Sequence, residues 1–163
     1  MPSFSHAPLS RHPALVPLSR DHYVGLVQAH RLMKAAAADD AQRRHALAEF
    51  ADAWERELVE HFRDEERLLG ALMSAEDRAR LVGEHARLAE LAQQARAARR
   101  EVAPDATALH ALGETLEGHI RWEERELFPR LQRQLNETQL TELQRHTAEL
   151  EAANRELESF AYS

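Results

Sequence analysis

Along most of the chain, apolar residues recur every three to four positions, which is the period of an amphipathic α-helix. The pattern predicts a first helix over about 19–38, capped by Ser19, with Leu26, Ala29 and Met33 on one stripe. Three further helices and a tail helix are predicted over about 40–69, 74–100, 105–128 and 138–160. The breaks between them are short, so consecutive helices should pack as antiparallel neighbours.

The use of glycine and proline also favours an all-α fold. Glycine occurs only five times, and four of the six prolines lie within the first 17 residues. Residues 1–18 are therefore predicted to form an N-terminal arm without regular helix, and Pro129 to end or kink the fourth helix. We expect an up-down-up-down four-helix bundle over 19–135. An additional C-terminal helix over 136–163 should pack on the bundle or form a dimer contact.

One sequence unit occurs twice. The segment His61–Leu69 returns 58 positions later as His119–Leu127, with six of nine residues identical. In both copies a glutamate follows the histidine by four residues, and helix positions i and i+4 lie on one face, one turn apart. Each unit can therefore direct an imidazole and a carboxylate at the same point.

A lone histidine precedes each unit, His22 by 39 residues and His85 by 34. In an antiparallel bundle, both lone histidines and both units fall toward the same end, at depths that agree to within about 10 Å. The sequence therefore predicts one metal site. Its six candidate ligands are His22, His61, Glu65, His85, His119 and Glu123.

Each unit contains two adjacent glutamates, and helix geometry separates their roles. Glu65 and Glu123 lie about 40° from their histidines around an ideal helix, whereas Glu66 and Glu124 lie about 140° away. The second pair is therefore expected on outer faces, unless a helix distortion near Gly70 or Pro129 exchanges the two glutamates of a unit. There it should pair with nearby arginines, namely Arg63, Arg67, Arg121 or Arg125.

The other histidines serve as controls for this assignment. Those on the helices point away from the predicted site face or lack a carboxylate at i+4, and we expect them on the surface. They are His30, His45, His110 and His146. His12 lies in the arm and could fold over the site end of the bundle.

The donor atoms restrict the metal. The chain has no cysteine, so every ligand must supply nitrogen or oxygen, a set that suits iron, manganese or zinc. Six ligands are too many for one tetrahedral zinc ion. Two metals bridged by Glu65 and Glu123 would use all six, as in carboxylate-bridged centres of helical bundles.

The pattern of histidines and His-x-x-x-Glu units, followed by Leu127-Phe128-Pro129, resembles the hemerythrin-like HHE cation-binding domain family over about residues 10–135. The resemblance implies a four-helix bundle with a non-haem di-iron centre that reacts with O₂ or related small oxidants, here peroxide or nitric oxide. Oxygen-carrying members place a fifth histidine four residues after the third-helix histidine. Here that residue is Ala89, which favours reaction with oxidants over reversible carriage of O₂.

Coordination arithmetic supports the same view of a di-iron centre. Two six-coordinate irons offer about 12 positions, of which two bridging carboxylates fill about four. An oxo or hydroxo bridge fills about two and the histidines about four, which leaves about two positions open to a small oxidant.

Other functions stay open at this point. The chain could be an iron store, or an iron donor related to repair proteins of the same fold. It could also be a metal-free helical module acting through the tail helix, where Leu143, Leu150 and Leu157 are seven apart and could pair two copies as a homodimer. The sequence does not decide whether the chain is an enzyme, and a weak di-iron oxidase or peroxidase is one alternative.

Charge and hydropathy exclude several classes of partner. The net charge is −7 and arginines alternate with glutamates, so no basic stripe for nucleic acid is present. No apolar run is long enough to span a membrane, and the N-terminus lacks the pattern of a signal peptide. We therefore expect a cytoplasmic protein without nucleic-acid or membrane partners.

Overall fold

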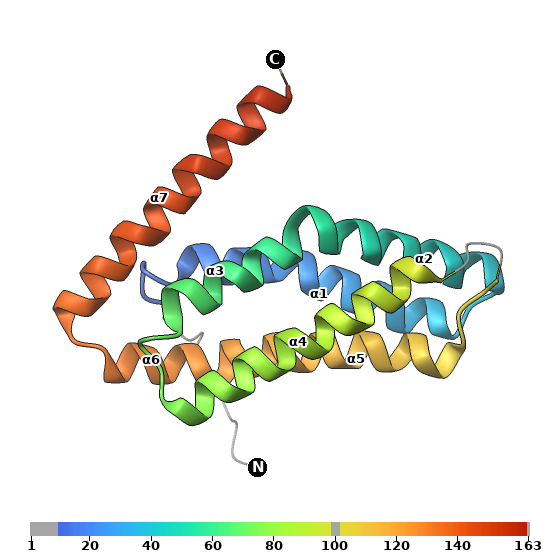
Figure 1. Ribbon diagram of the computed structural model, residues 1–163, viewed down its shortest axis with the longest axis horizontal. Coiled ribbons are helices and arrows are strands. Elements are labelled where there is room, and N and C mark those ends of the chain that lie inside the picture. Colours follow the sequence, from blue (N-terminus) through green and yellow to red (C-terminus); the bar gives the residue numbers. More distant parts are fainter. Residues whose placement is uncertain (1–9, 99–101, 163) are drawn as a thin grey trace, which may run out of the picture.

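The computed structural model describes residues 10–98 and 102–162, and all regular secondary structure within these ranges is helical (Figure 1). Four rods form the bundle, and two of them contain a short π-helical turn. The elements are α1 (Val16–Ala36), α2 (Asp40–Ala53), η1 (Trp54–Leu58), α3 (Val59–Leu69), α4 (Ala75–Ala97), α5 (Ala106–Trp122), η2 (Glu123–Leu127), α6 (Phe128–Gln134) and α7 (Glu137–Ala161). The turn η1 joins α2 to α3 in one rod, and η2 joins α5 to α6 in another. The predicted all-α bundle is confirmed.

Short polar side chains start most of the helices. Asp39, Ser74 and Asp105 precede α2, α4 and α5, and each accepts a hydrogen bond from the backbone N–H three residues later. Asn136 and Gln139 form a reciprocal capping box at the start of α7. These caps confirm the predicted breaks, because each satisfies a backbone N–H that the first helical turn leaves without a partner.

The start of α1 differs from the prediction. The helix begins at Val16 rather than at Ser19, and Pro17 lies in its first turn. A proline is tolerated there because the first N–H groups of a helix have no partner within the helix, and the fixed φ of proline is already helical. The expectation that residues 1–18 hold no regular helix was therefore wrong for the last three of them.

The helix also continues past Pro129, because the chain widens into η2 just before it. The N–H of Phe128 donates to the carbonyl of Glu123, five residues back. In a regular α-helix the proline ring would press against the carbonyl of Arg125, four residues back. The wider π turn relieves this clash and lets α6 continue to Gln134.

The buried apolar residues form two clusters along the bundle axis. The first, here called the inner cluster, is centred on Leu32, Phe50 and Leu116. The second, the arm-side cluster, includes Leu15 and Phe128. In every rod, a candidate ligand lies between a residue of one cluster and a residue of the other. The flanking pairs are Leu18 and Ala29, Leu58 and Leu69, Leu81 and Leu88, and Leu116 and Leu127. The candidate ligands thus occupy a polar layer between two apolar ones.

The tail helix α7 leaves the bundle at an angle (Figure 1). Its first half packs through Leu143 and Thr147, which are buried, and Glu151 reaches back to form an ion pair with Arg20 at 3.0 Å. The second half is mostly solvent-exposed, and Leu157 is 69% exposed. In the part of the chain that is described, no helix is long and apolar enough to cross a membrane.

Candidate metal centre

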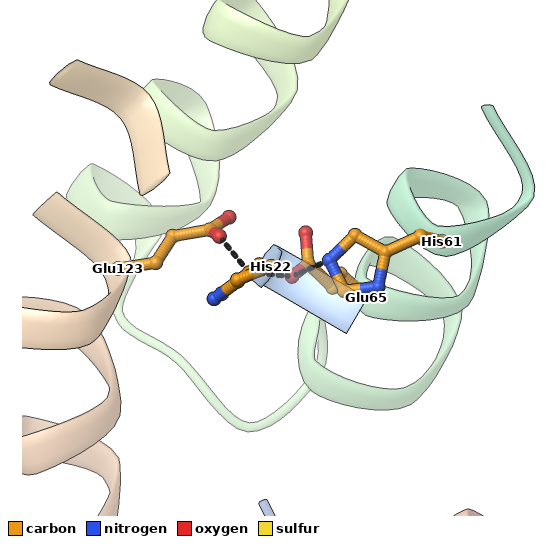
Figure 2. Close-up of side chains that lie close together, drawn as sticks. All are labelled: His22, His61, Glu65 and Glu123. Atoms are coloured by element: carbon orange, nitrogen blue, oxygen red, sulfur yellow. Dashed lines mark hydrogen bonds and ion pairs between the residues drawn. The ribbon is translucent and has the colours of Figure 1, made fainter. Parts of the chain in front are cut away.

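The six residues singled out by the repeat come together inside the bundle. Their exposed fractions lie between 0 and 5%. His22 comes from α1, His61 and Glu65 from α3, and Figure 2 shows them converging with Glu123 of η2. His85 of α4 and His119 of α5 complete the cluster. Within it, ligand atoms form two groups whose members lie within 4.8 Å of one another, namely His22, His61, Glu65 and Glu123, and Glu65, His85, His119 and Glu123.

Glu65 belongs to both groups because its two oxygens face different histidines. Its Oε1 lies 2.7 Å from Nε2 of His61 and 3.0 Å from Nε2 of His22. Its Oε2 lies 3.2 Å from Nε2 of His85. The side chain is fully buried at the centre of the layer.

Glu123 repeats this arrangement from the opposite rod. Its Oε2 lies 2.7 Å from Nε2 of His22, and its Oε1 lies 2.9 Å from Nε2 of His119. Each carboxylate therefore offers one oxygen to the pair His22 and His61 and the other to the pair His85 and His119. The two ligand groups thus share both carboxylates.

Several of these buried atoms lack hydrogen bonds despite the short distances. Nε2 of His61, Oε2 of Glu65 and both carboxylate oxygens of Glu123 have no hydrogen-bond partner among the described residues. A buried polar atom without a partner costs about 1–3 kcal/mol. Buried donor atoms that lack a hydrogen bond are typical of ligands directed at a common cation, so the residues fit a metal site.

The second nitrogen of every site histidine contacts a carboxylate. An imidazole that binds metal through one nitrogen usually donates its other N–H to such a group, which fixes the tautomer and the orientation of the ring. The Nδ1-to-oxygen distances are 2.6 Å for His22–Glu124, 3.2 Å for His61–Asp21, 3.1 Å for His85–Glu66 and 2.7 Å for His119–Glu84.

These four pairs form a closed outer ring around the site. Each pair joins two neighbouring rods. The pairs link the rod of α1 to that of α3, α3 to α4, α4 to the rod of α5 and η2, and this last rod back to α1. The prediction that Glu66 and Glu124 pair with Arg63, Arg67, Arg121 or Arg125 was wrong. Of those arginines, Arg63, Arg67 and Arg121 pair with Glu60, Asp64 and Glu117 instead.

The other two carboxylates of the outer ring were not predicted from the sequence. Asp21 and Glu84 directly precede the lone histidines His22 and His85. Each accepts from the histidine of a His-x-x-x-Glu unit on the neighbouring rod. The repeated acid-histidine pair was the signal that could have identified them.

The other histidines of the described residues lie outside both ligand groups. His30, His45 and His110 are exposed, as predicted. His146 lies at the surface near Glu142 and Glu149. His12 does not reach the cluster, since its Nδ1 accepts the N–H of Ala14 at 3.0 Å. The arm residue that approaches the site is Arg11, which contacts Glu124.

Burial and charge oppose each other in the metal-free cluster. Burial lowers the pKa of His61, but the charge of Glu65 and the hydrogen bond to Asp21 outweigh it and raise the pKa to about 9. The pKa of His119 is raised to about 9 in the same way, against burial, by Glu123 and Glu84.

The carboxylates shift in the opposite direction. Burial and repulsion by Glu65 raise the pKa of Glu123, but His119 and His22 outweigh them and lower it to about 2. Without metal, protonated imidazoles therefore surround ionised carboxylates. A metal ion would replace those protons, because imidazole binds metal in its neutral form.

Comparison with known proteins agrees with this chemistry. No curated protein matches the chain, and no solved structure matches it. The family model of the hemerythrin HHE cation-binding domain matches residues 20–131 and, in a second overlapping match, residues 76–161. The first match spans all six candidate ligands, and the second runs through the second unit into α7. The chain therefore belongs to the hemerythrin HHE cation-binding domain family.

Proposed function

We propose that this protein holds two iron ions between its histidine pairs and reacts with a small oxidant such as O₂, peroxide or nitric oxide. One observation carries the proposal. Glu65 and Glu123 each divide their two oxygens between the same two histidine pairs, which is the arrangement that bridges a metal pair.

The donor set suits iron and argues against a single zinc ion. Four imidazoles and two carboxylates exceed what one tetrahedral zinc ion can use, and thiolate ligands are excluded because the chain has no cysteine. Bound iron would supply redox chemistry and open coordination positions for a small molecule. The protein would supply buried anionic charge, neutral imidazoles and an outer ring of carboxylates that holds those imidazoles in place.

The third rod supports reaction over reversible carriage. Its inward face presents Leu81, His85 and Leu88, whereas Ala89 is exposed. Consequently α4 offers one histidine, His85. The metal position beside His85 and His119 would therefore keep room for an external ligand. A protein that turns this ligand over would be a weak oxidase or peroxidase. A protein that binds the ligand without turning it over would be a sensor.

Iron analysis with absorption spectroscopy tests the proposal. Protein produced with ample iron should contain about two irons per chain and show near-ultraviolet oxo-to-iron charge transfer that disappears on reduction. Reoxidation of the reduced protein by O₂ or peroxide would distinguish a redox protein from an iron store or donor, which would release its iron instead. One zinc per chain under iron-replete conditions would contradict the proposal, and a metal-free protein would favour a helical interaction module.

A further inference from the structure

Residues 10–12 of the N-terminal arm lie at one corner of the candidate metal centre. Arg11 lies there with its side chain only 12% exposed, although it precedes the first helix. Its guanidinium is 5.4 Å from the ring centre of Phe128, and that ring stacks on the imidazole of His22. Gln132 of α6 holds the arm in place through the backbone of Ser10 and His12.

Arg11 satisfies a backbone group that the π turn leaves without a helical partner. In an α-helix the carbonyl of Glu124 would accept from the N–H of Phe128, but that N–H donates to Glu123 instead. The next group along the chain is the nitrogen of Pro129, which carries no hydrogen. Arg11 Nη2 donates to the carbonyl oxygen of Glu124 at 2.7 Å and so fills this gap.

The same nitrogen also binds the side chain of Glu124. Arg11 Nη2 lies 2.7 Å from Oε2, while Oε1 of the same carboxylate lies 2.6 Å from Nδ1 of His22. The guanidinium therefore fixes both the backbone and the carboxylate of the residue that orients His22. A planar guanidinium suits this task, because the two N–H groups of Nη2 can serve both acceptors of Glu124 while Nη1 donates to Oε1 of Gln132 at 3.2 Å.

We propose that Arg11 is a positioning residue for the metal position formed by His22 and His61, acting through Glu124. The inference rests on the proposed function for its metal, but its geometry involves only this chain. It makes the arm part of the site. It also predicts that the two metal positions differ, because Glu66, the partner of His85, forms no ion pair with the described residues of the arm.

Iron release to a chelator tests the proposal directly. Arg11→Ala should release one of its two irons about tenfold faster than the unsubstituted protein, at the lower end of what outer partners of metal ligands contribute. Arg11→Lys keeps the charge but not the forked donors, so its rate should be intermediate. The control is Arg130→Ala, which breaks an ion pair between α6 and α4 at 2.8 Å that touches no site histidine, and its release should match the unsubstituted protein.

A double substitution separates positioning from a general effect of the arm. If Arg11 acts through Glu124, the variant Arg11→Ala/Glu124→Ala should release iron no faster than Glu124→Ala alone. Additive rates would overturn the proposal, as would equal release from the unsubstituted protein, Arg11→Ala and Arg11→Lys.

A second readout needs no metal. In the metal-free protein, Arg11→Ala should shift the imidazole nitrogen resonances of His22 in a ¹⁵N NMR spectrum while leaving those of His119 unchanged. An unshifted His22 would refute the coupling even if iron release changed. Conversely, a protein that shows the His22 shift but binds no iron would refute the proposed function and leave the role of Arg11 intact.

Discussion

Raising the pH from 6.5 to 9 should destabilise the metal-free protein. In the folded chain the pKa of His61 is about 9, whereas that of an ordinary histidine is 6.5. A raised pKa means that the folded state binds the proton more tightly than the unfolded state does. The resulting stabilisation is complete below 6.5 and is lost as the pH rises through 9.

The effect is large because burial, which lowers the pKa of His61, is outweighed by the charge of Glu65 and the hydrogen bond to Asp21. A pKa of about 9 against 6.5 corresponds to about 3 kcal/mol for this one side chain. His119 has the same raised value, and the pKa values of His22 and His85 are shifted in the same direction. Since a domain is typically stable by about 5–15 kcal/mol, a loss of about 3 kcal/mol or more should be plain.

Urea unfolding followed by far-ultraviolet circular dichroism measures this loss. The free energy of unfolding should be compared at pH 6.5 and pH 9 in the presence of a chelator. His61→Gln should reduce the difference, whereas His45→Gln, which changes an exposed histidine, should not. A stability that is constant or rises over this interval would refute the assignment of protonated imidazoles to the metal-free cluster. Iron-loaded protein should lack the decrease, because coordination keeps the imidazoles neutral.

Four further predictions concern the ligands, the helix packing, the reactivity and the tail. Glu65→Ala and Glu123→Ala should each abolish binding of a metal pair, whereas Glu66→Ala should retain two metals with about 10–100-fold weaker affinity, as measured by competition with a chelator. Gly113→Ala should cost about 1–3 kcal/mol in thermal unfolding, because a Cβ there would lie 2.7 Å from Met33 and 2.8 Å from the carbonyl of Ala29. Gly118→Ala, with nothing within 4 Å, should instead gain up to about 1 kcal/mol. In stopped-flow mixing with O₂, the reduced protein should oxidise without a stable reversible oxygenated form. His12→Ala should leave the oxidation rate unchanged, and a changed rate would show that His12 does contribute to the site. Pairing of two copies through α7 stays a prediction. Light scattering should give the mass of a dimer for the unsubstituted protein and of a monomer for Leu157→Glu, whereas a monomer mass for both proteins would exclude pairing through α7.

The sequence predicted the features that depend on local spacing. The caps at Asp39, Ser74 and Asp105 follow from residue type, because a short polar side chain competes well for the free N–H groups of a first turn. The convergence of the six candidate ligands follows from helical periodicity together with antiparallel order. The caps and the convergence of the ligands depend only on distances along one helix or on the alternating direction of successive helices.

Features that depend on how one rod is rotated against another were missed. Glu66 and Glu124 lie on outer faces of their own helices, as the periodicity indicates, but each of them also contacts a histidine of a neighbouring rod. The π turns were also missed, since one extra residue per turn leaves little trace in an apolar pattern. Pro129 was a partial signal, and its effect was misjudged because the widened turn allows the helix to continue past it.

The division of the core into two apolar clusters has a consequence for cooperativity. The polar layer between them would be bridged by metal when metal is bound, and it is held by contacts between imidazoles and carboxylates when it is not. Without the metal pair, the arm-side cluster around Phe128 is joined to the inner cluster by continuous helix backbones, by ionic contacts and by ring contacts, such as those of His119 with Trp122 on one side and Phe62 on the other. Metal supply would thereby decide whether the chain unfolds as one unit or as two. Amide hydrogen exchange would then report a single global opening in α5 and α6 with metal, and an earlier, separate opening of α6 without it.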